Sequence, residues 1–332
     1  MINITITKNE EGQRLDRFLR KYMNGAPLSY IYKLIRKDVK VNGKRGKEDQ
    51  MLTEGDTLAL FISEEELNHY TKQVKKPHAK RQFKVLFEDD NVLAVDKPFG
   101  LLTHGDRTEK KNHLANQVVS YLIETGSYNP RIERTFVPAP ANRLDRNTTG
   151  LVLFGKTSEA LRDLNKMIRE KGYVNKYYRA VVFGNVKAEL VLKDKMEKDG
   201  RNNQITVRDI DDDSEGLKVM ETIARPVMHA SDGKGHDYTL LEVELVTGRT
   251  HQIRAHLAKA GYPIIGDAKY GDLRANGAVQ RKFNLTTQFL HAYRLEFVQG
   301  AGSLEYLAGT EVICPLPENL QQIQDKIFKD NK

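Results

Sequence analysis

The chain is best understood from one stretch, Asn142-Arg143-Leu144-Asp145-Arg146-Asn147-Thr148-Thr149-Gly150-Leu151-Val152-Leu153-Phe154. Residues 151–154 form an apolar run of the length expected for a buried strand. The residues before them show no helical period and end in a Thr-Thr-Gly turn, which predicts a loop at the edge of that strand. A rigid strand behind the loop can aim Asp145 outward. Asp145 is therefore the candidate nucleophile.

The tetrapeptide around Asp145 also occurs at Arg14-Leu15-Asp16-Arg17. In that first copy Leu15, Phe18, Leu19 and Tyr22 follow the spacing of an amphipathic helix. We therefore expect Asp16 to be a solvated helix residue without a catalytic role. Position in the chain, and not the tetrapeptide itself, distinguishes the two aspartates.

Length and composition indicate a soluble globular protein. The 332 residues, 39% of them hydrophobic, suffice for two domains or for one large domain with a small appendage. No apolar run approaches the ~18 residues that span a bilayer, and residues 1–6 lack a basic leader, so we expect no membrane segment and a cytoplasmic location. The single cysteine, Cys314, and the spacing of the nine histidines predict no disulfide framework, no metal and no cofactor.

Positive charge is concentrated near the N-terminus. Residues 1–84 carry 18 Lys and Arg against 11 Asp and Glu, so they hold +7 of the formal net charge of +8. Within residues 12–47 there are 11 basic and two acidic residues. Such a density attracts a polyanion through counterion release, which indicates nucleic acid as the partner. The alternative is a basic face that only solvent covers.

The same N-terminal segment is patterned to fold. Helical spacing is found over residues 14–22 and 29–37, with Ser29 as the predicted N-cap. Asn42-Gly43 within residues 39–45 predicts a hairpin turn, and residues 57–61 predict a strand. This helix-helix-strand order resembles the S4 RNA-binding domain over residues 13–62. By that resemblance we assign RNA contacts to the basic residues Arg14, Arg17, Lys33, Arg36, Lys37, Lys44 and Arg45.

The remainder of the chain predicts a second, larger domain. We place an S4-like domain at residues 1–64, a basic linker at residues 65–82 and the large domain at residues 83–332. Within the latter we predict a hairpin at residues 85–95, helices at 114–122, 161–168 (ending at Gly172) and 320–327, and strands at 177–183 and 240–246. Helices and strands do not alternate regularly, which favours an α+β fold.

A second candidate site segment is Thr247-Gly248-Arg249-Thr250-His251-Gln252-Ile253-Arg254. Ile253, Leu257 and Ala260 mark the apolar stripe of a helix, and Arg254 projects off that stripe. An arginine there can hold a carboxylate ionised through a bidentate pair. It can equally bind phosphate or form a surface ion pair, and spacing alone does not identify its partner.

Five groups of residues, in order along the chain, resemble the RluA-type pseudouridine synthases, and among these the RluC-like enzymes of large-subunit ribosomal RNA that carry an S4 domain. The matching residues are Val95-Asp96-Lys97-Pro98 with Gly100 and His104; Arg143-Leu144-Asp145 with Thr148, Gly150 and Lys156; Lys176 with Tyr178, Ala180, Val182 and Gly184; Thr247 to Arg254 with His256, Pro263, Gly266-Asp267 and Tyr270-Gly271; and Phe289-Leu290-His291-Ala292.

This resemblance implies the pseudouridine synthase fold, with a mixed and mainly antiparallel sheet. It assigns Asp145 as the essential aspartate, Arg254 as its salt-bridge partner, Tyr178 as the aromatic that stacks on the target uracil, and Leu290 as an apolar wall. We further expect Arg143, Thr148, Arg249 and His251 to contact the substrate. Two positions depart from the family pattern, because Asn142 stands where His is usual and Thr149 where Ser is usual; both keep hydrogen-bonding capacity, so we expect any effect in RNA-loop contacts and not in catalysis.

The expected activity is isomerisation of specific uridines in structured RNA, most of all large-subunit (23S) ribosomal RNA, by base flipping and an aspartate nucleophile. The attacked carbon, ribose C1′ or uracil C6, is not given by the sequence, and we expect a monomer. Three alternatives remain: a synthase that acts on tRNA, a non-catalytic RNA-binding or ribosome-assembly protein, and an RNA N-glycosidase that hydrolyses the bond without rejoining it and releases uracil. A protein kept only for binding has no need for all of Asp145, Tyr178 and Arg254.

Overall fold

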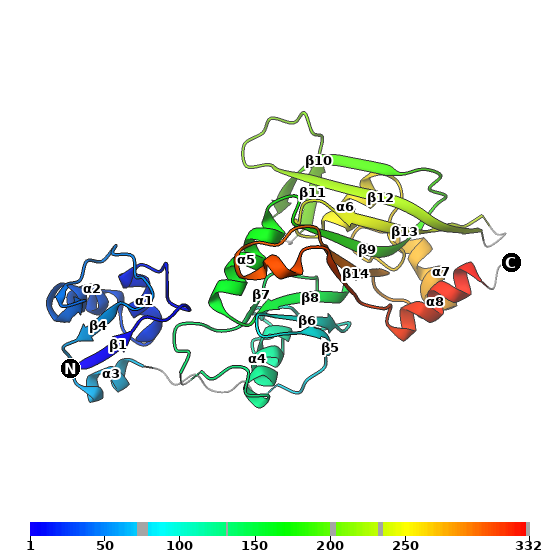
Figure 1. Cartoon of the computed structure of the whole chain (residues 1–332). Helices are drawn as coiled ribbons and strands as arrows, with labels where there is room; N and C mark the ends of the chain where they lie inside the picture. The colour runs from blue at the N-terminus through cyan, green and yellow to red at the C-terminus, as the bar shows by residue number, and fades with distance from the viewer. Residues whose placement is uncertain (72–78, 131, 200–203, 232–234, 330–332) are drawn as a thin grey trace.

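The computed structural model describes residues 1–71, 79–130, 132–199, 204–231 and 235–329. These residues form a four-stranded sheet near the N-terminus and an eleven-stranded sheet in the rest of the molecule. Figure 1 shows the N-terminal unit, in blue, to the left of the part of the chain that holds the large sheet. Among the helices in these ranges, none has the length and apolar character that crossing a bilayer requires.

The N-terminal unit comprises β1 (Ile2–Thr5), α1 (Leu15–Tyr22), α2 (Leu28–Asp38), β2 (Val39–Val41), β3 (Lys44–Arg45) and β4 (Thr57–Leu60). Its strands pair antiparallel in the order β1-β4-β2-β3. The two helices bury Leu15, Leu19, Ile31 and Ile35 in a core of their own. The predicted helices, hairpin and strand are confirmed, and β1 is an addition that sequence patterning did not reveal.

The turn between β2 and β3 follows from Asn42-Gly43. Both residues have positive φ angles, 50° and 76°, as a two-residue hairpin turn of type I′ requires. The Asn42 side chain also donates to Asp56 at 2.7 Å and accepts from the Thr57 amide at 2.9 Å. The turn is thereby tied to β4, which fixes the register of the small sheet.

The prediction that Ser29 caps α2 is wrong. The helix begins at Leu28, and Pro27 is its N-cap residue with φ −66° and ψ 151°. Ser29 therefore lies inside the first turn. Proline is favoured at a helix start because its fixed φ suits the helix and its missing N–H would have no partner there.

The prediction that Asp16 is solvated is also wrong. Asp16 is 6% exposed, and its two oxygens accept from Arg14 Nε and Nη2, each at 3.0 Å. The backbone of residues 48–50 covers this end of α1, because Glu48 O and Gln50 O accept from the Asp16 and Leu15 amides. The helical period identified the apolar face of α1. It could not reveal that residues 48–50, more than thirty positions away, cover Asp16.

Helix α3 (Glu64–Tyr70) occupies the start of the segment predicted as a linker. The Tyr70 ring lies 4.2 Å from the ring of Tyr30, whose hydroxyl donates to Glu66 at 2.7 Å. Residues 65–70 are therefore packed on the N-terminal unit and do not form an extended linker. Most of the basic part of that segment, residues 72–78, lies outside the described residues.

The large sheet comprises β5 (Lys84–Glu88), β6 (Val92–Lys97), β7 (Ala139–Pro140), β8 (Thr149–Gly155), β9 (Val174–Phe183), β10 (Leu190–Asp199), β11 (Gln204–Arg208), β12 (Lys218–Ser231), β13 (Asp237–Leu245), β14 (Leu290–Phe297) and β15 (Thr310–Ile313). Its main path is β11-β10-β12-β13-β9-β14-β8-β6-β5, with β15 beside β14 and β7 beside β8. Strands β14 and β8 pair in parallel, and the other described pairings of this sheet are antiparallel. The predicted α+β class with a mixed, mainly antiparallel sheet is confirmed.

The parallel pair places the Asp145 loop. All seven residues of β8 are buried, as the apolar run predicted. Gly150 has φ +110°, and a Cβ atom there would lie 2.1 Å from Ala292 O, so only glycine permits β14 to come this close. Because His291 is in register with Thr149, both strands begin at the same edge of the sheet. The loop before β8 consequently lies beside Leu290, the first residue of β14.

The helices of the large domain are α4 (Leu114–Glu124), α5 (Ser158–Arg169), α6 (Gln252–Lys259), α7 (Leu273–Phe283) and α8 (Glu318–Phe328), with a 3-10 helix η1 (Gly302–Leu307). Helix α5 packs on β8, and α6 packs on β11 and β12. The prediction that α5 ends at Gly172 is wrong, because the helix stops at Arg169 with Glu170 as C-cap. Gly172, with φ +89°, lies in the turn that follows.

The loop before α1 contacts the large domain near the start of α5. The Ser158 amide donates to Asn9 at 3.2 Å, Lys8 pairs with Glu159 at 3.1 Å, and the Thr135 hydroxyl donates to Glu10 at 2.5 Å. The N-terminal unit is therefore joined to the large domain by polar contacts of Lys8, Asn9 and Glu10.

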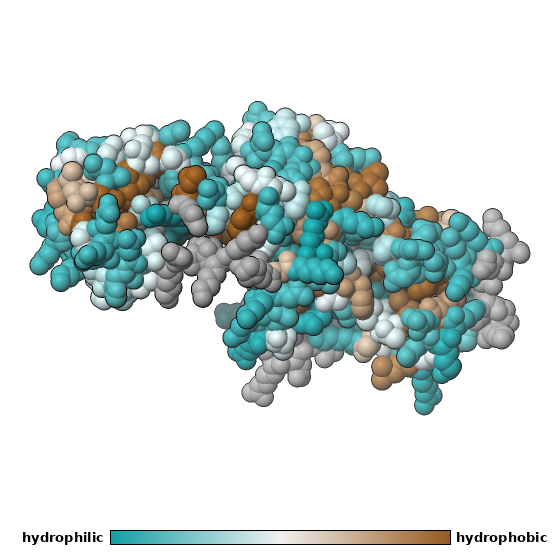
Figure 2. Space-filling model, turned by 90° about the horizontal axis from the view of Figure 1, so that it is seen from below, coloured by the Kyte–Doolittle hydropathy of each residue, from teal (hydrophilic) through white to brown (hydrophobic). Residues whose placement is uncertain are grey.

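On the face shown in Figure 2, hydrophobic residues form separate patches among hydrophilic ones.

Candidate active site

A cleft of about 790 Å³ opens where β8, β9 and β14 meet the start of α6. It is lined by the loop before β8, by residues of β9, β14 and α6, and by the end of α5. Among them are all eight residues assigned from the sequence to catalysis or substrate contact, namely Arg143, Asp145, Thr148, Tyr178, Arg249, His251, Arg254 and Leu290. The structure thus brings together residues that are as far as 147 positions apart in the chain.

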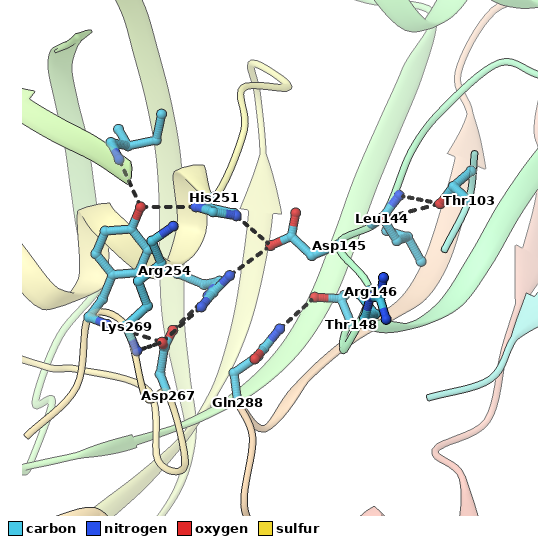
Figure 3. Close-up of polar contacts among 12 residues, drawn as sticks. Thr103, Leu144, Asp145, Arg146, Thr148, His251, Arg254, Asp267, Lys269 and Gln288 are labelled. Carbon is cyan, nitrogen blue, oxygen red and sulfur yellow. Dashed lines mark hydrogen bonds and ion pairs between the residues drawn. The ribbon is translucent and has the colours of Figure 1, made fainter. Parts of the chain in front are cut away.

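Arg254 links the Asp145 carboxylate to a second, buried carboxylate (Figure 3). Its Nη1 donates to Asp145 Oδ2 at 3.0 Å, while Nε and Nη2 donate to the two oxygens of Asp267 at 2.7 and 2.9 Å. Asp267 is fully buried, whereas the Asp145 side chain keeps 27% of its surface exposed toward the cleft. The bidentate pair fixes the plane of the guanidinium, so that Nη1 is held in place to orient Asp145.

The arrangement of charges keeps this pair ionised. Burial opposes the charge on Arg254, but the hydrogen bonds and negative charges of Asp267 and Asp145 outweigh it and raise the arginine pKa. Burial likewise opposes the charge on Asp267, and the contacts with Arg254, Lys269 and Tyr270 lower the pKa of this carboxyl. A buried pair is stable as ions only with such saturated hydrogen bonding.

His251 faces Asp145 from the side opposite the loop. Its Nε2 lies 3.8 Å from Asp145 Oδ2, and its Nδ1 lies 3.0 Å from the Tyr270 hydroxyl. That hydroxyl also accepts from the Ile205 amide at 2.9 Å. Burial lowers the pKa of His251. One ring nitrogen of His251 thus lies beside Asp145 and the other beside Tyr270.

Two buried side chains hold the backbone of the Asp145 loop. Lys97 Nζ donates to Leu101 O at 2.8 Å, to Arg146 O at 3.0 Å and to Pro98 O at 3.1 Å, while burial lowers the lysine pKa to about 7. The Thr103 hydroxyl donates to Leu144 O at 3.0 Å and accepts from the Leu144 amide at 3.2 Å. The residues on both sides of Asp145 are thus fixed.

Tyr178 and Leu290 form the apolar side of the cleft. Both are buried, and they lie on the neighbouring strands β9 and β14. Burial, with a smaller contribution from the charge of Asp145, raises the pKa of the Tyr178 hydroxyl. The phenol is therefore neutral in the free protein, and its ring is available for stacking.

Arg143 and Arg249 are exposed residues at the cleft, and Thr148 is buried beneath the loop. The Thr148 amide donates to Asp145 O at 3.1 Å, which closes the turn around the carboxylate. Its hydroxyl lies 3.4 Å from Gln288 Nε2. Thr148 therefore shapes the loop, while the two arginines are placed to meet a ligand.

The two departures from the family pattern have structural roles. Asn142 accepts from the Leu153 amide at 2.8 Å and donates to Leu151 O at 3.1 Å, so its side chain pairs with the edge of β8. The Thr149 hydroxyl is buried against His291 Nδ1 at 2.8 Å. Both replacements contact the sheet, whereas the sequence led us to expect effects on RNA-loop contacts.

The basic residues predicted to bind RNA lie on α1, α2 and β3, except Arg14, which is the N-cap residue of α1. Arg17, Lys33, Arg36, Lys37 and Lys44 are exposed, and in the described part of the chain none of these five side chains forms an ion pair. Two of the predicted residues have local structural contacts as well. Arg14 binds Asp16, and Arg45 donates through Nε to Arg36 O at 2.6 Å, near the C-terminus of α2.

Sequence analysis did not assign a role to Asp267, Tyr270, Lys97 or Thr103. Three of them belong to the matching segments, but nothing in their spacing pointed to Arg254, His251 or the Asp145 loop. Asp267 follows Gly266 in a short connection, and its partners come from α6 and from its own loop. For the described residues, no group of three or more His, Cys, Asp or Glu side chains is placed to hold a metal ion.

Comparison with known proteins agrees with this geometry. The family model described as RNA pseudouridylate synthase matches residues 91–259. Two proteins named ribosomal large subunit pseudouridine synthase C, from Vibrio cholerae and Escherichia coli K12, are each 32% identical to the chain, and both alignments cover 98% of this chain and 96% of the relative. The solved structure of human RNA pseudouridylate synthase domain containing 4 shares the fold, with a TM-score of 0.55 and 19% identity over 72% of this chain and 92% of that one. On these grounds the chain belongs to the RNA pseudouridylate synthase family.

Proposed function

We propose that this protein isomerises specific uridines of large-subunit ribosomal RNA to pseudouridine, with Asp145 as the nucleophile. The observation that carries the proposal is the open Asp145 carboxylate held by Arg254, whose Nε and Nη2 are bound by buried Asp267. The choice of RNA is supported by the names of relatives that align over nearly the whole chain.

The reaction requires three events at one nucleotide. The bond between N1 and ribose C1′ breaks, the freed uracil rotates, and C5 bonds to C1′; the proton on C5 is lost and N1 gains one. Atoms and electrons balance without a cofactor, so the protein must supply a nucleophile, a wall and proton transfer. Asp145 supplies the nucleophile, either at C1′ with uracil as the leaving group or at C6 by addition.

Only an everted base can reach this carboxylate. Eversion costs a few kcal/mol, and stacking on an aromatic ring returns ~1–3 kcal/mol. Tyr178 offers that ring, and Leu290 closes the other apolar side of the cleft. Uracil that has been detached is then confined between them and cannot leave before C5 reacts.

Tyr178 is a stacking residue in the first step and not a base. Its pKa is raised by burial and by the charge of Asp145, so the phenol keeps its proton. Once Asp145 forms a covalent bond its negative charge is removed, and with it the second cause of the raised pKa. Burial still raises the pKa at that point, so Tyr178 can accept the C5 proton in the last step only after it has given its own phenolic proton to N1, the atom that gains one.

The N-terminal unit supplies affinity for structured RNA. We assign S4-like RNA binding to residues 1–64 and catalysis to residues 83–332, with the exposed basic residues of α1 and α2 contacting phosphates. The proposal takes the protein to act as a cytoplasmic monomer. Sedimentation of the complex with RNA should then show one chain per modified site.

The experiment uses purified protein and unmodified transcripts of large-subunit rRNA, small-subunit rRNA and tRNA. Pseudouridine is located by carbodiimide labelling and primer extension, and released uracil is measured in the same samples. We expect labelled positions in large-subunit rRNA alone and no free uracil. Modification confined to tRNA would contradict the substrate, and stoichiometric uracil release would contradict the isomerisation.

A further inference from the structure

Three lysines are buried in the described part of the chain, namely Lys97, Lys156 and Lys176. Two of them have their partners within the protein. Lys97 donates to three carbonyl oxygens, and Lys156 donates to Glu88 at 2.9 Å and to Asp89 O at 2.5 Å. Lys176 differs, since its one hydrogen bond is a long contact of 3.4 Å to Ile168 O.

Lys176 has no counter-charge within the described residues. Its ammonium carries three donors, and no carboxylate among those residues lies within ion-pair distance of it. Burial is the cause that lowers its pKa, with no acidic neighbour acting against it. A buried cation without a partner is costly. An anion bound from outside the chain would supply the counter-charge that the described residues lack.

The position of Lys176 indicates what that partner is. Val174, Lys176, Tyr178 and Ala180 occupy one buried face of β9, so Lys176 lies two residues, about 6.6–6.8 Å along the strand, from the ring on which the uracil stacks. Lys176 also lines the same cleft as Asp145. A nucleotide whose base is on Tyr178 has its backbone phosphates at the edge of that cleft.

The other charges of the cleft favour an anion. Its rim carries Arg143, Arg169, Lys171 and Arg249, and Asp145 is the one carboxylate among the lining residues. Field lines are focused in such a groove. Most rim cations are exposed and attract RNA without distinguishing one phosphate from another, whereas Lys176 is 7% exposed and has a single place to hold a ligand.

We propose that Lys176 binds the phosphodiester adjacent to the everted uridine and so positions C1′ against Asp145. This inference rests on the proposed function, because the anion is the RNA backbone at the target nucleotide. The competing role for Lys176 is structural: its bond to Ile168 O lies in the last turn of α5, where a cation is favourable. The test has to separate these two roles.

The experiment is a chemical double-mutant cycle with an RNA fragment that the wild-type protein modifies. The phosphates on the 5′ and 3′ sides of the target uridine are replaced one at a time by neutral methylphosphonates. The variant is Lys176→Gln, which removes the charge but keeps a donor for Ile168 O. Lys187→Gln, at an exposed lysine outside the cleft, is the matched control.

For the wild-type protein we expect one of the two replacements to lower kcat/KM by about 10–100-fold, as for loss of a charged hydrogen bond. Lys176→Gln should lose a similar factor on native RNA and nothing further on that methylphosphonate RNA. Lys187→Gln should behave as the wild type. A wild type that is indifferent to both replacements would overturn the inference, whichever variants fold.

Two other results would also overturn it. One is a Lys176→Gln protein within twofold of the wild type on native RNA. The other is losses that multiply in the cycle, which would mean that Lys176 and the phosphate act independently. If Lys176→Gln does not fold, Lys176→Met takes its place in the same cycle. An absence of pseudouridine with the wild-type protein on native RNA would instead refute the proposed function.

Discussion

The tetrapeptide Arg-Leu-Asp-Arg occurs at residues 14–17 and 143–146, and the aspartates of the two copies have opposite surroundings. In the first, Asp16 lies in helix α1 and both its oxygens are bound by its neighbour Arg14. In the second, Asp145 lies on a loop and is bound by Arg254, which is 109 positions away, while part of its carboxylate faces a cleft. The Asp16 carboxylate is fully bound by residues of its own segment. The Asp145 carboxylate is bound by a distant residue and remains partly accessible from the cleft.

This difference shows what a reactive aspartate needs. Asp16 has used its oxygens for local structure, so no ligand can reach them. The Asp145 carboxylate accepts one hydrogen bond among the described residues, from a guanidinium that Asp267 already holds in place. The proposed nucleophilic role of Asp145 thus rests on a rigid partner from a distant segment and on the open side of its carboxylate.

The largest expected effect concerns the carboxylates themselves. Asp145→Asn should lower the single-turnover rate of pseudouridine formation on the order of 10³-fold or more, because the nucleophile is lost. RNA affinity should stay nearly unchanged, as measured by filter binding. The matched control, Asp16→Asn, should keep the rate within about threefold, since its carboxylate is remote from the chemistry. Activity of Asp145→Asn within tenfold of the wild type would remove Asp145 from its role.

The next effect concerns Asp267, which holds Arg254, the residue that binds Asp145. Asp267→Asn should lower kcat by about 10–100-fold, because Arg254 loses its bidentate support and Asp145 is misplaced. Affinity for RNA should not change. Asp272→Asn, five residues further on, is the control: Asp272 caps α7, and asparagine is an equally good N-cap. Equal rates for Asp267→Asn and the wild type would show that Arg254 orients Asp145 without this support.

The converse prediction concerns stability at Asp16. Asp16→Ala removes an acceptor that binds Arg14 and the Arg17 amide. We expect faster hydrogen exchange of amides in α1 and α2 and a fall of ~5 °C in the melting midpoint of the N-terminal unit. Exchange in β9 and β14 should be unaffected. If the amides of α1 were as well protected from hydrogen exchange as in the wild type, Asp16 would not stabilise the N-terminal unit.

The smallest effect concerns the diffuse charge of the N-terminal unit. Changing Lys33, Arg36 and Lys37 together to glutamine should weaken RNA binding by about tenfold and reduce the slope of log K against log salt by about 2. The rate at saturating RNA should not change. A triple glutamine variant at exposed Lys187, Lys282 and Lys326 serves as control. An unchanged salt slope would contradict the assignment of RNA contacts to α2.

Much of the fold could be predicted because its signals are local. The Asn42-Gly43 turn, the apolar strand β8 and the helical spacing of α1, α2, α4 and α8 are properties of short segments, and the structure confirms them. The errors arose where a distant or neighbouring segment decides the outcome. Residues 48–50 cover Asp16. Pro27, and not Ser29, is the N-cap residue of α2. The ring of Tyr30 packs against Tyr70, so that residues 65–70 lie on the N-terminal unit.

The site could be predicted only in part. Asp145 was singled out by its place before a buried strand, but its pairing with Arg254 came from the resemblance and not from spacing. Asp267 and Tyr270 stand in a matching segment, yet their function depends on geometry that crosses the fold. Lys176 differs from Lys97 and Lys156 only through what surrounds it, which no local pattern encodes.

The most direct test of the account is the structure of the Asp145→Asn protein bound to RNA that contains the target uridine. We predict one everted uridine in the cleft, with its base stacked on Tyr178 against Leu290 and its C1′ or C6 facing the side chain at position 145. RNA bound with every base stacked in the helix, or with a base everted anywhere other than this cleft, would contradict the account.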